Sequence, residues 1–183
     1  MGTNKLVPAI AVATAAVLVG YFFWQNSFAV IPVASMPHYS SEDGVSFMYP
    51  DTYELSMHVE GNGERSWNFL VLLPKGYVPP EAGEGPPSIS MGVFPNPEGL
   101  SVEQWVKGDG RSNWKLIVDD RASRPMIVGG KAALWYHYSG LYETDSVAVA
   151  YGEKIFLFSV GWLDPQDQIR LDFNNLVSGV QFD

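Results

Sequence analysis

Three histidines are the first side chains to test for chemistry, because imidazole serves as a metal ligand and as a general base. They are His38, His58 and His137. None has a second histidine or a cysteine at a spacing typical of zinc sites, and the chain contains no cysteine. His58 lies on a polar strand face, and His137 shares a strand face with Trp135. The pattern predicts structural histidines and no metal site.

Two acidic pairs are the next candidates. Calcium requires about six to eight oxygen ligands, usually from a dedicated loop, and no EF-hand loop is present. Asp164, which is paired with Asp167, precedes a proline as a helix cap does, and Asp119-Asp120 is typical of a turn. We therefore expect no cofactor, with a weak surface cation site as the alternative.

One constellation is similar to an enzyme. Ser35–Pro37 (SMP) resembles the Ser-Met-x-Pro motif of the Ser–Lys signal peptidases, and residues 107–112 (KGDGRS) resemble their later Gly-Asp-Asn-Arg segment. That mechanism needs a serine nucleophile and a buried neutral lysine, which would be Lys75 or Lys131. Both matches are partial, because SMP lacks the residue before its proline and KGDGRS has glycine in place of asparagine. A membrane-bound Ser–Lys peptidase is the alternative function.

Tryptophans and one long loop are the candidates for binding. Among the six tryptophans, those inside strand patterns should be core, whereas Trp105 and Trp114 are predicted to be exposed platforms. Residues 74–87 form the longest segment without a structural period, and function concentrates in such loops. The predicted partner-binding residues are Tyr77, Val78, Pro79, Pro80, Trp105 and Trp114. A tolerated surface insertion is the alternative interpretation of the loop.

The elements that must position these residues begin with an apolar segment. Leu6–Trp24 contains 19 residues and no charge. As a helix it would span about 28 Å, close to the roughly 30 Å hydrocarbon core of a bilayer. Its last four residues (YFFW) are aromatic, as residues at a membrane interface often are. We predict a single transmembrane helix that anchors the chain in the cell membrane.

Charges beside this segment predict its orientation. Lys5 precedes it, and no Lys or Arg follows it until Arg65. The positive-inside rule therefore places the N-terminus in the cytoplasm and the rest of the chain outside. Ser27 and Ala29 also fit a signal-peptide cleavage site, and cleavage after Ala29 would give a secreted protein. The length of the apolar segment favours an uncleaved anchor.

The charge balance of the chain disfavours some classes of binding partner. The formal net charge is −9, and all 20 acidic residues but only 10 of the 11 basic residues follow Trp24. The part outside the membrane therefore carries a formal charge of −10. An acidic surface argues against nucleic acid and against anionic lipid headgroups as partners. It also keeps a domain soluble. We expect a protein partner at the cell envelope.

Residues 25–38 contain two prolines and no helical period. They predict a tether that joins the anchor, residues 1–24, to one extracytoplasmic domain, residues 39–183. The apolar content of 46% is enough for a hydrophobic core in this domain.

Alternating apolar residues predict a β-rich domain, with tight turns at Gly61–Gly63 and Gly129–Gly130. The later strands are apolar on both faces, so the sheet should be covered on both sides. Residues 113–118 fit a helix and a strand equally well. The expected extended segments are Val45–Tyr49, Tyr53–Val59, Trp67–Leu73, Ile89–Val93, Met126–Val128, Lys131–Tyr138, Thr144–Tyr151, Lys154–Trp162 and Val180–Phe182.

Two helices are also predicted. Ser101 and Gln104 have the spacing of a capping box, and the helix that they begin should end at Gly108. Asp164 and Pro165 should be the N-cap and the first residue of a second helix. Its amphipathic stripe consists of Ile169, Phe173, Leu176 and Val177.

In this order the segments GVSFMYP, GGKAALWYHYSGLYETDSVAVAYGEKIFLFSVGW and SGVQF resemble the PsbP-like family, which is named for an extrinsic subunit of photosystem II. The resemblance covers about residues 39–182. It implies an antiparallel sheet between helices and a role in binding or scaffolding instead of catalysis. Phe47, Tyr49 and Pro50 are then architectural.

The predicted fold class is therefore α+β, an antiparallel β-sheet covered by helices (a PsbP-like α/β/α sandwich) preceded by one N-terminal transmembrane helix. The predicted function is a membrane-anchored extracytoplasmic binding or scaffolding module whose ligand the sequence does not identify.

Overall fold

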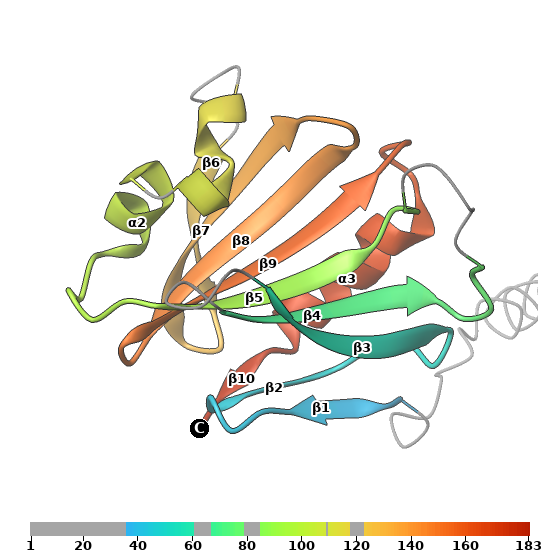
Figure 1. Cartoon of the computed structure of the whole chain (residues 1–183), viewed down its shortest axis with the longest axis horizontal. Coiled ribbons are helices and arrows are strands. Elements are labelled where there is room, and N and C mark those ends of the chain that lie inside the picture. The colour runs from blue at the N-terminus through green and yellow to red at the C-terminus, as the bar shows by residue number, and fades with distance from the viewer. Residues whose placement is uncertain (1–35, 61–66, 79–84, 109, 118–122) are drawn as a thin grey trace, which may run out of the picture. The chain divides into compact units, whose positions relative to one another are not determined.

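Seven antiparallel strands form the main sheet of the computed structural model, which describes residues 36–60, 67–78, 85–108, 110–117 and 123–183. Their spatial order is β3-β4-β5-β9-β8-β7-β6 (Figure 1). The bounds are β3 Tyr53–Glu60, β4 Trp67–Pro74, β5 Ile89–Pro95, β6 Ser123–Val128, β7 Lys131–Ser139, β8 Glu143–Tyr151 and β9 Lys154–Trp162. Residues Met36–Asp183 form one compact unit.

In the described part of the chain, a smaller sheet and four helical segments accompany the main sheet. The smaller sheet has the order β1-β2-β10, with β1 at His38–Ser40, β2 at Val45–Met48 and β10 at Gln181–Phe182. The α-helices are α2, Val102–Gly108, and α3, Gln168–Ser178. Two single turns of 3₁₀-helix, η3 at Gly110–Ser112 and η4 at Trp114–Leu116, follow α2. In Figure 1, α3 lies behind the main sheet, and α2 stands beside β7.

Strand register gives the main sheet two different faces. Met91 of β5 pairs with Phe158 of β9, which pairs with Val147 of β8, so these three bulky side chains share one face. Because side chains alternate along a strand, the residues between them point to the opposite face. We call the first the α3 face and the second the α2 face, after the helix that packs on each.

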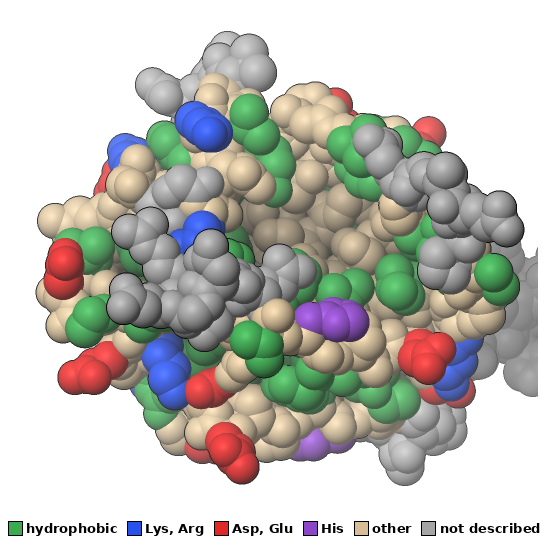
Figure 2. Space-filling model, viewed as in Figure 1, with side chains coloured by type: hydrophobic (Ala, Val, Ile, Leu, Met, Phe, Trp, Pro, Cys, Tyr) green, Lys and Arg blue, Asp and Glu red, His purple; other side chains and the backbone are tan. Residues whose placement is uncertain are grey.

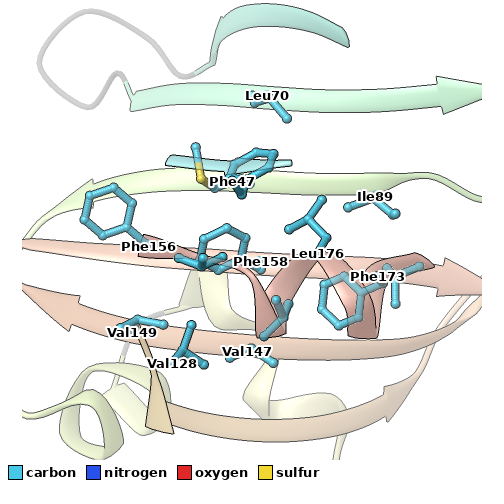
Figure 3. Packing of buried hydrophobic residues seen from close by; sticks show 14 of the residues in the cluster. Phe47, Leu70, Ile89, Val128, Val147, Val149, Phe156, Phe158, Phe173 and Leu176 are labelled. Carbon is cyan, nitrogen blue, oxygen red and sulfur yellow. The ribbon is translucent and has the colours of Figure 1, made fainter. Parts of the chain in front are cut away.

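The main hydrophobic core lies between the α3 face, helix α3 and strand β2. Figure 3 shows Phe158 and Val147 of the sheet beside Phe173 and Leu176 of α3, with Phe47 of β2 above them. Phe158 and Phe173 are completely buried. Full burial of one such side chain contributes about 1.5–3 kcal/mol. The predicted stripe of the second helix is confirmed, because Phe173, Leu176 and Val177 are buried and Ile169 packs against the same core.

A second core fills part of the α2 face. It joins Trp105 and Val106 of α2 to Tyr136 of β7 and Leu157 of β9. The predicted sheet with two covered faces is therefore confirmed, although its α2 face is covered over only part of its area, as Figure 2 shows.

Helix α2 begins where the sequence predicts. The amide of Ser101 donates to Oε1 of Gln104 at 3.0 Å, and the amide of Gln104 donates to Oγ of Ser101 at 3.3 Å. These reciprocal bonds are a capping box, which satisfies amides that have no partner inside the helix.

The predicted start of the second helix at Asp164 and Pro165 is wrong, because α3 begins at Gln168 after the N-cap Asp167. Oδ2 of Asp167 accepts hydrogen bonds from the amides of Leu163 and Asp164, both at 2.9 Å. Oδ1 of Asp164 accepts from the amide of Gln166 at 2.8 Å. These bonds hold the segment as a turn, since short acidic side chains compete with helix formation. The hydrogen bonds from the amides of Asp164 and Leu163 also lower the pKa of Asp167.

Other expectations are refined. The segment that fits helix and strand equally forms η4 up to Leu116, and its last residue lies outside the described residues. His38 belongs to strand β1 instead of an irregular tether. Strands β3 and β4 pair antiparallel up to Glu60 and Trp67, whereas the turn predicted at Gly61–Gly63 lies outside the described residues.

The predicted transmembrane helix, Leu6–Trp24, also lies outside the described residues. Within the part of the chain that the structure describes, no helix is long and apolar enough to cross a membrane.

One buried hydrogen bond ties α3 to the edge strand β3. The Tyr53 hydroxyl donates to Oδ2 of Asp172 at 2.8 Å, and Nε2 of Gln168 donates to the other oxygen of Asp172 at 2.9 Å. Burial of the phenol, together with its hydrogen bond to Asp172, raises the pKa of Tyr53 above its usual value of 10.0.

This bond predicts a loss of stability in alkaline solution. Above about pH 10 the unfolded chain releases the Tyr53 proton while the folded chain retains it, so the stabilisation is present below pH 10 and is lost as the pH rises. We expect Tyr53→Phe to be less stable than the wild type by about 1–2 kcal/mol near pH 8, with a smaller difference at higher pH. Urea unfolding of both proteins between pH 8 and pH 11 measures this. A difference that does not change with pH contradicts the assignment.

Candidate functional site

Small side chains aligned across three strands leave the α2 face hollow. Ser90 of β5 pairs with Ser159 of β9, which pairs with Ser146 of β8. Gly92 and Gly161 lie two residues further along β5 and β9 on the same face. Hydroxyl and glycine positions cannot fill the space that the bulky residues fill on the α3 face. Figure 2 shows the hollow over the middle of the sheet, between apolar rims.

Trp67 and Phe94, two members of a row of three aromatic rings (the aromatic stack), form one wall of this hollow. The Trp67 and Phe94 rings lie 5.5 Å apart, and the Phe94 and Trp105 rings lie 5.2 Å apart, measured between centroids. Gly92 is required here, because a Cβ at this position would come within 2.7 Å of the Phe94 ring. The position of the Phe94 ring therefore depends on a glycine two residues earlier in the same strand, β5.

Arg111 of η3 caps this stack. Its guanidinium carbon lies 4.7 Å from the ring centroid of Phe94 and 5.5 Å from that of Trp67. The planar guanidinium suits stacking on aromatic faces, with an attraction of about 0.5–2 kcal/mol.

Another part of the lining comes from η3 and from Asn113, the residue that follows it. The Tyr136 hydroxyl donates to the carbonyl of Ser112 at 2.7 Å, and Oγ of Ser112 donates to the carbonyl of Val106 at 2.6 Å. These bonds fix the segment on the sheet. Asn113 has a left-handed backbone with φ of 58° and donates through Nδ2 to the Tyr138 hydroxyl at 3.1 Å.

The resulting cavity, which we call the serine hollow, has a volume of about 250 Å³. Its lining is Trp67, Phe69, Ser90, Phe94, Arg111, Asn113, Tyr138, Leu157 and Ser159. Among the described residues, the polar part of this lining consists of hydroxyl, amide and guanidinium groups. Such a lining can hold the acceptor oxygen atoms of a ligand while the aromatic wall contacts its apolar part.

A second, larger cavity of about 410 Å³ lies at the end of the sheet and shares Trp67 and Phe94 with the serine hollow. Nζ of Lys154 and Oδ1 of Asp43 form an ion pair of 2.6 Å in its lining. Val59, which is 73% exposed, also lines it. The aromatic pair thus separates two cavities of different chemistry.

A charged cluster lies on the α3 face, where strands β7 and β8 pass the start of α3. The buried carboxylate of Asp145 accepts from Nε of Arg170 at 2.6 Å, and its other oxygen lies 2.9 Å from Nδ1 of His137. Nε2 of His137 lies 2.9 Å from an oxygen of Glu143. The other oxygen of Glu143 accepts from the Ser139 hydroxyl at 3.0 Å. His137 thus faces a carboxylate at each ring nitrogen. It can donate a hydrogen bond to both carboxylates only when both ring nitrogens carry a hydrogen atom.

Tryptophans frame this cluster. The His137 ring stacks on Trp135 with centroids 6.4 Å apart and lies 5.6 Å from Trp162. Arg170 lies over Trp162 at 4.4 Å, and Arg124 lies over Trp135 at 4.6 Å. The prediction that His137 is a hydrogen-bonded structural histidine is confirmed, although the sequence did not reveal its carboxylate partners.

The two tryptophans predicted as exposed platforms are placed differently. That prediction is wrong for Trp105, which is 3% exposed, because it fills the aromatic stack. Trp114 is half-buried and packs edge-on against Tyr136, with Lys107 over its ring at 5.5 Å. Neither tryptophan lines the serine hollow.

Of the predicted loop residues, the described ones, Tyr77 and Val78, line neither cavity. Val78 is 81% exposed, and Tyr77 is half-buried. Pro79 and Pro80 lie outside the described residues. Partner binding by Tyr77 and Val78 stays a prediction.

The peptidase alternative receives no support. Ser35 lies outside the described residues. Lys75 is exposed, and Lys131 lies over the Tyr151 ring at 4.8 Å, so neither is the desolvated lysine that the mechanism requires. Among the described residues, no group of three or more acidic or histidine side chains could hold a metal ion. The acidic pair Asp119-Asp120 lies outside them.

Sequence reasoning missed the serine hollow, although part of its signal is visible. Ser90 and Gly92, and likewise Ser159 and Gly161, are two residues apart and must share a strand face. Small residues with this spacing in two strands indicate a hollow only if the two strands are neighbours and pair in the matching register. A local sequence pattern does not predict the order of strands in a sheet. Arg111 carries no comparable signal.

Comparisons with solved structures agree with this architecture. The solution structure of cyanobacterial PsbP (CyanoP) from Synechocystis sp. PCC 6803 matches with a TM-score of 0.56 and 12% identity, covering 86% of this chain and 98% of that chain. A crystal structure from Bacteroides thetaiotaomicron VPI-5482 matches with a TM-score of 0.50 and 10% identity, covering 80% of this chain and 48% of that chain. No protein-family model and no curated protein matches the sequence.

The chain therefore has a PsbP-like fold, as the sequence predicts. The α+β class is confirmed by the antiparallel sheet with helices on its two faces. At identities of 12% and 10% the likeness shows the fold alone.

The Asp145 cluster predicts a large effect of one isosteric substitution. Asp145→Asn leaves His137 and Arg170 facing a neutral amide, and removing one member of a buried charge pair costs about 3–5 kcal/mol. We expect about 2–3 kcal/mol, because His137 and Arg170 are 27% and 28% exposed and water can partly solvate them. Urea unfolding measures the loss.

The matched control is Glu103→Gln, which removes an ion pair with Lys107 on α2. The side chains of that pair are 65% and 51% exposed, so we expect little change in stability. Equal effects of the two substitutions would contradict the assignment of Asp145 as the buried link between α3 and β8.

Proposed function

We propose that the chain is a membrane-anchored extracytoplasmic module that binds or scaffolds other molecules at the cell envelope. Three features support this proposal: the apolar segment Leu6–Trp24, the acidic charge of everything after it, and the PsbP-like fold of the domain. If the chain is cleaved after Ala29, the same module is secreted. The proposed partner is a protein. We do not propose nucleic acid as a partner, because the domain is acidic.

The observation that carries the binding role is the half-open α2 face. One face of the sheet is sealed by α3 and β2, whereas the other retains the serine hollow beside an aromatic wall. A purely structural sheet would fill such a space with larger side chains, because protein interiors are close-packed.

The charged cluster supports a structural role more than a catalytic one. Asp145 and His137 have the spacing of the base and its orienting acid in a hydrolase triad. The third position, however, is occupied by the carboxylate of Glu143 at 2.9 Å from Nε2, where a nucleophile would have to lie. The cluster instead fixes α3 to β8.

The proposed topology predicts where the domain can be cut. We expect protease added outside intact cells to remove the domain, because the charges flanking Leu6–Trp24 place the following residues outside. In a cell with an outer membrane, that membrane must first be permeabilised. Immunoblotting against the domain before and after lysis of the inner membrane measures this. Protection that ends only on lysis of the inner membrane contradicts the topology.

The exposed loop residue Val78 supplies a second test, because partner surfaces use exposed apolar side chains. We expect Val78→Asp to reduce capture of the envelope partner by the full chain, measured by cross-linking in membranes followed by mass spectrometry. The matched control is Ile127→Asp, since Ile127 is 68% exposed on the edge strand β6. Equal capture by the two variants and the wild type would show that the loop at Val78 is only a connection.

A further inference from the structure

We propose that one end of the main sheet lies on the surface of a lipid bilayer whose headgroups carry no net charge. This inference rests on the proposed membrane anchor and adds a second membrane contact, which the domain itself makes. The contacting residues are Val78, Leu141 and Leu163.

These three residues project from turns and are among the most exposed large apolar side chains of the described chain. Val78 lies just beyond the end of β4, Leu141 lies in the turn between β7 and β8, and Leu163 directly follows β9. Their exposed fractions are 81%, 60% and 69%. Single exposed apolar residues are common on protein surfaces, so their shared position is the informative observation.

Strand register places the three turns at one end of the sheet. Glu143, the first residue of β8, pairs with Trp162, the last residue of β9. Ile89, the first residue of β5, pairs with Val160 of β9 and with Leu72 of β4. Strands β4 and β9 therefore end together where β5 and β8 begin, as Figure 1 shows for β4, β5 and β9 on its right-hand side.

The described chain also begins at this end. The amide of Tyr49 donates to the carbonyl of Pro37 at 3.1 Å, next to the start of β1. The amide of Lys75 donates to the carbonyl of Thr52 at 2.8 Å, which joins the segment after β2 to the turn after β4. In Figure 1, β1 begins on the side where β4 ends. We call this end of the main sheet the Met36 end.

The length of the intervening chain allows a bilayer contact. Residues 25–35 lie between Trp24, the last residue of the predicted anchor, and Met36. Fully extended at roughly 3.3–3.6 Å per residue, they span at most about 40 Å. The chain therefore enters the domain within this distance of the predicted anchor, at the end that carries the three apolar side chains.

Internal hydrogen bonds prepare two of these turns for an apolar surface. The amide of Gly140 donates to the carbonyl of Tyr142 at 3.0 Å, and the amide of Leu163 donates to Oδ2 of Asp167 at 2.9 Å. A backbone amide without a partner is costly to move out of water. Since these amides are already bonded, Leu141 and Leu163 can approach lipid at a lower cost.

The spacing of the apolar side chains favours lipid over a protein surface. A stable protein interface buries about 800 Å² on each partner around a closely packed centre. Leu141 and Leu163 instead belong to separate turns, and neither lines one of the two cavities described above. A fluid bilayer surface accepts apolar side chains that enter it separately.

The charge of the Met36 end indicates the class of lipid. Among the described residues of its turns, Asp51, Asp164 and Asp167 are acidic, and Lys75 is the one basic residue. Anionic headgroups attract basic segments and repel acidic ones. A zwitterionic headgroup such as phosphocholine is therefore the expected contact.

Single cysteines can report this contact, because the natural chain contains none. The full chain with Leu141→Cys or Leu163→Cys is labelled with a small fluorophore and reconstituted in phosphatidylcholine vesicles whose acyl chains carry bromine, a short-range quencher. We expect at least about twofold stronger quenching than at a control site, because apolar side chains at an interface enter about 5–10 Å into the boundary between headgroups and acyl chains.

The matched control site is Ile127→Cys. Ile127 is 68% exposed, and it lies beside the turn between β6 and β7, where Val128 pairs with Lys131. Because β7 runs from Lys131 to Ser139, this turn is at the opposite end of the sheet from Leu141. A fluorophore there should be quenched only weakly.

Two further comparisons test the chemistry of the contact. Leu141→Asp should reduce quenching of the fluorophore at position 163, whereas Ile127→Asp should leave it unchanged, since a carboxylate is costly to bury in lipid. Replacing half of the phosphatidylcholine by phosphatidylglycerol should also reduce quenching at positions 141 and 163.

The inference is overturned if positions 141 and 163 are quenched no more than position 127, or if phosphatidylglycerol strengthens their quenching. If Leu141→Asp fails to fold, the comparison of the three labelled positions decides the question alone. Flotation of the full chain with the vesicles tests the anchor separately. A chain that floats without quenching at 141 and 163 overturns only this inference, whereas a chain that does not float overturns the proposed anchoring as well. Val78 is left unlabelled because the proposed partner contact includes it.

Discussion

Antiparallel register among β5, β9 and β8 is the constraint on which the rest of the domain depends. It aligns Met91, Phe158 and Val147 on one face of the sheet, and Ser90, Ser159 and Ser146 on the other. The bulky row gives α3 and β2 a continuous apolar surface, whose burial supplies the main stabilisation. The small row leaves a hollow on the opposite face. A shift by one residue would exchange the two rows and remove both the core and the hollow.

Helix α3 is held over this sheet by polar links as well as by apolar packing. Tyr53 of β3 binds Asp172, and Asp145 of β8 binds Arg170, so the helix is tied to strands on both sides of the centre. Hydrophobic burial has little directional preference, whereas buried hydrogen bonds fix orientation because an unmade bond is costly. These two links therefore determine how α3 lies across the sheet.

The two faces of the main sheet differ in how their side chains pack. The α3 face contains the larger core and the buried charge cluster. The α2 face holds an aromatic stack whose order depends on Gly92 and on Arg111. Side chains of the serine hollow can consequently change with modest cost to the main core, since distant sites act almost independently.

Local patterns in the sequence determined most of the strands, the α2 capping box and the stripe of α3, because alternation and capping depend on residues only a few positions apart. They misplaced the start of α3, where Asp167 accepts hydrogen bonds from the amides of Leu163 and Asp164 and the helix begins only after it. Only the tertiary structure decided that Trp105 is buried, that Arg111 lies over three aromatic rings, and that His137 meets Asp145. These contacts join residues from different elements, so they depend on strand order, which no local pattern encodes.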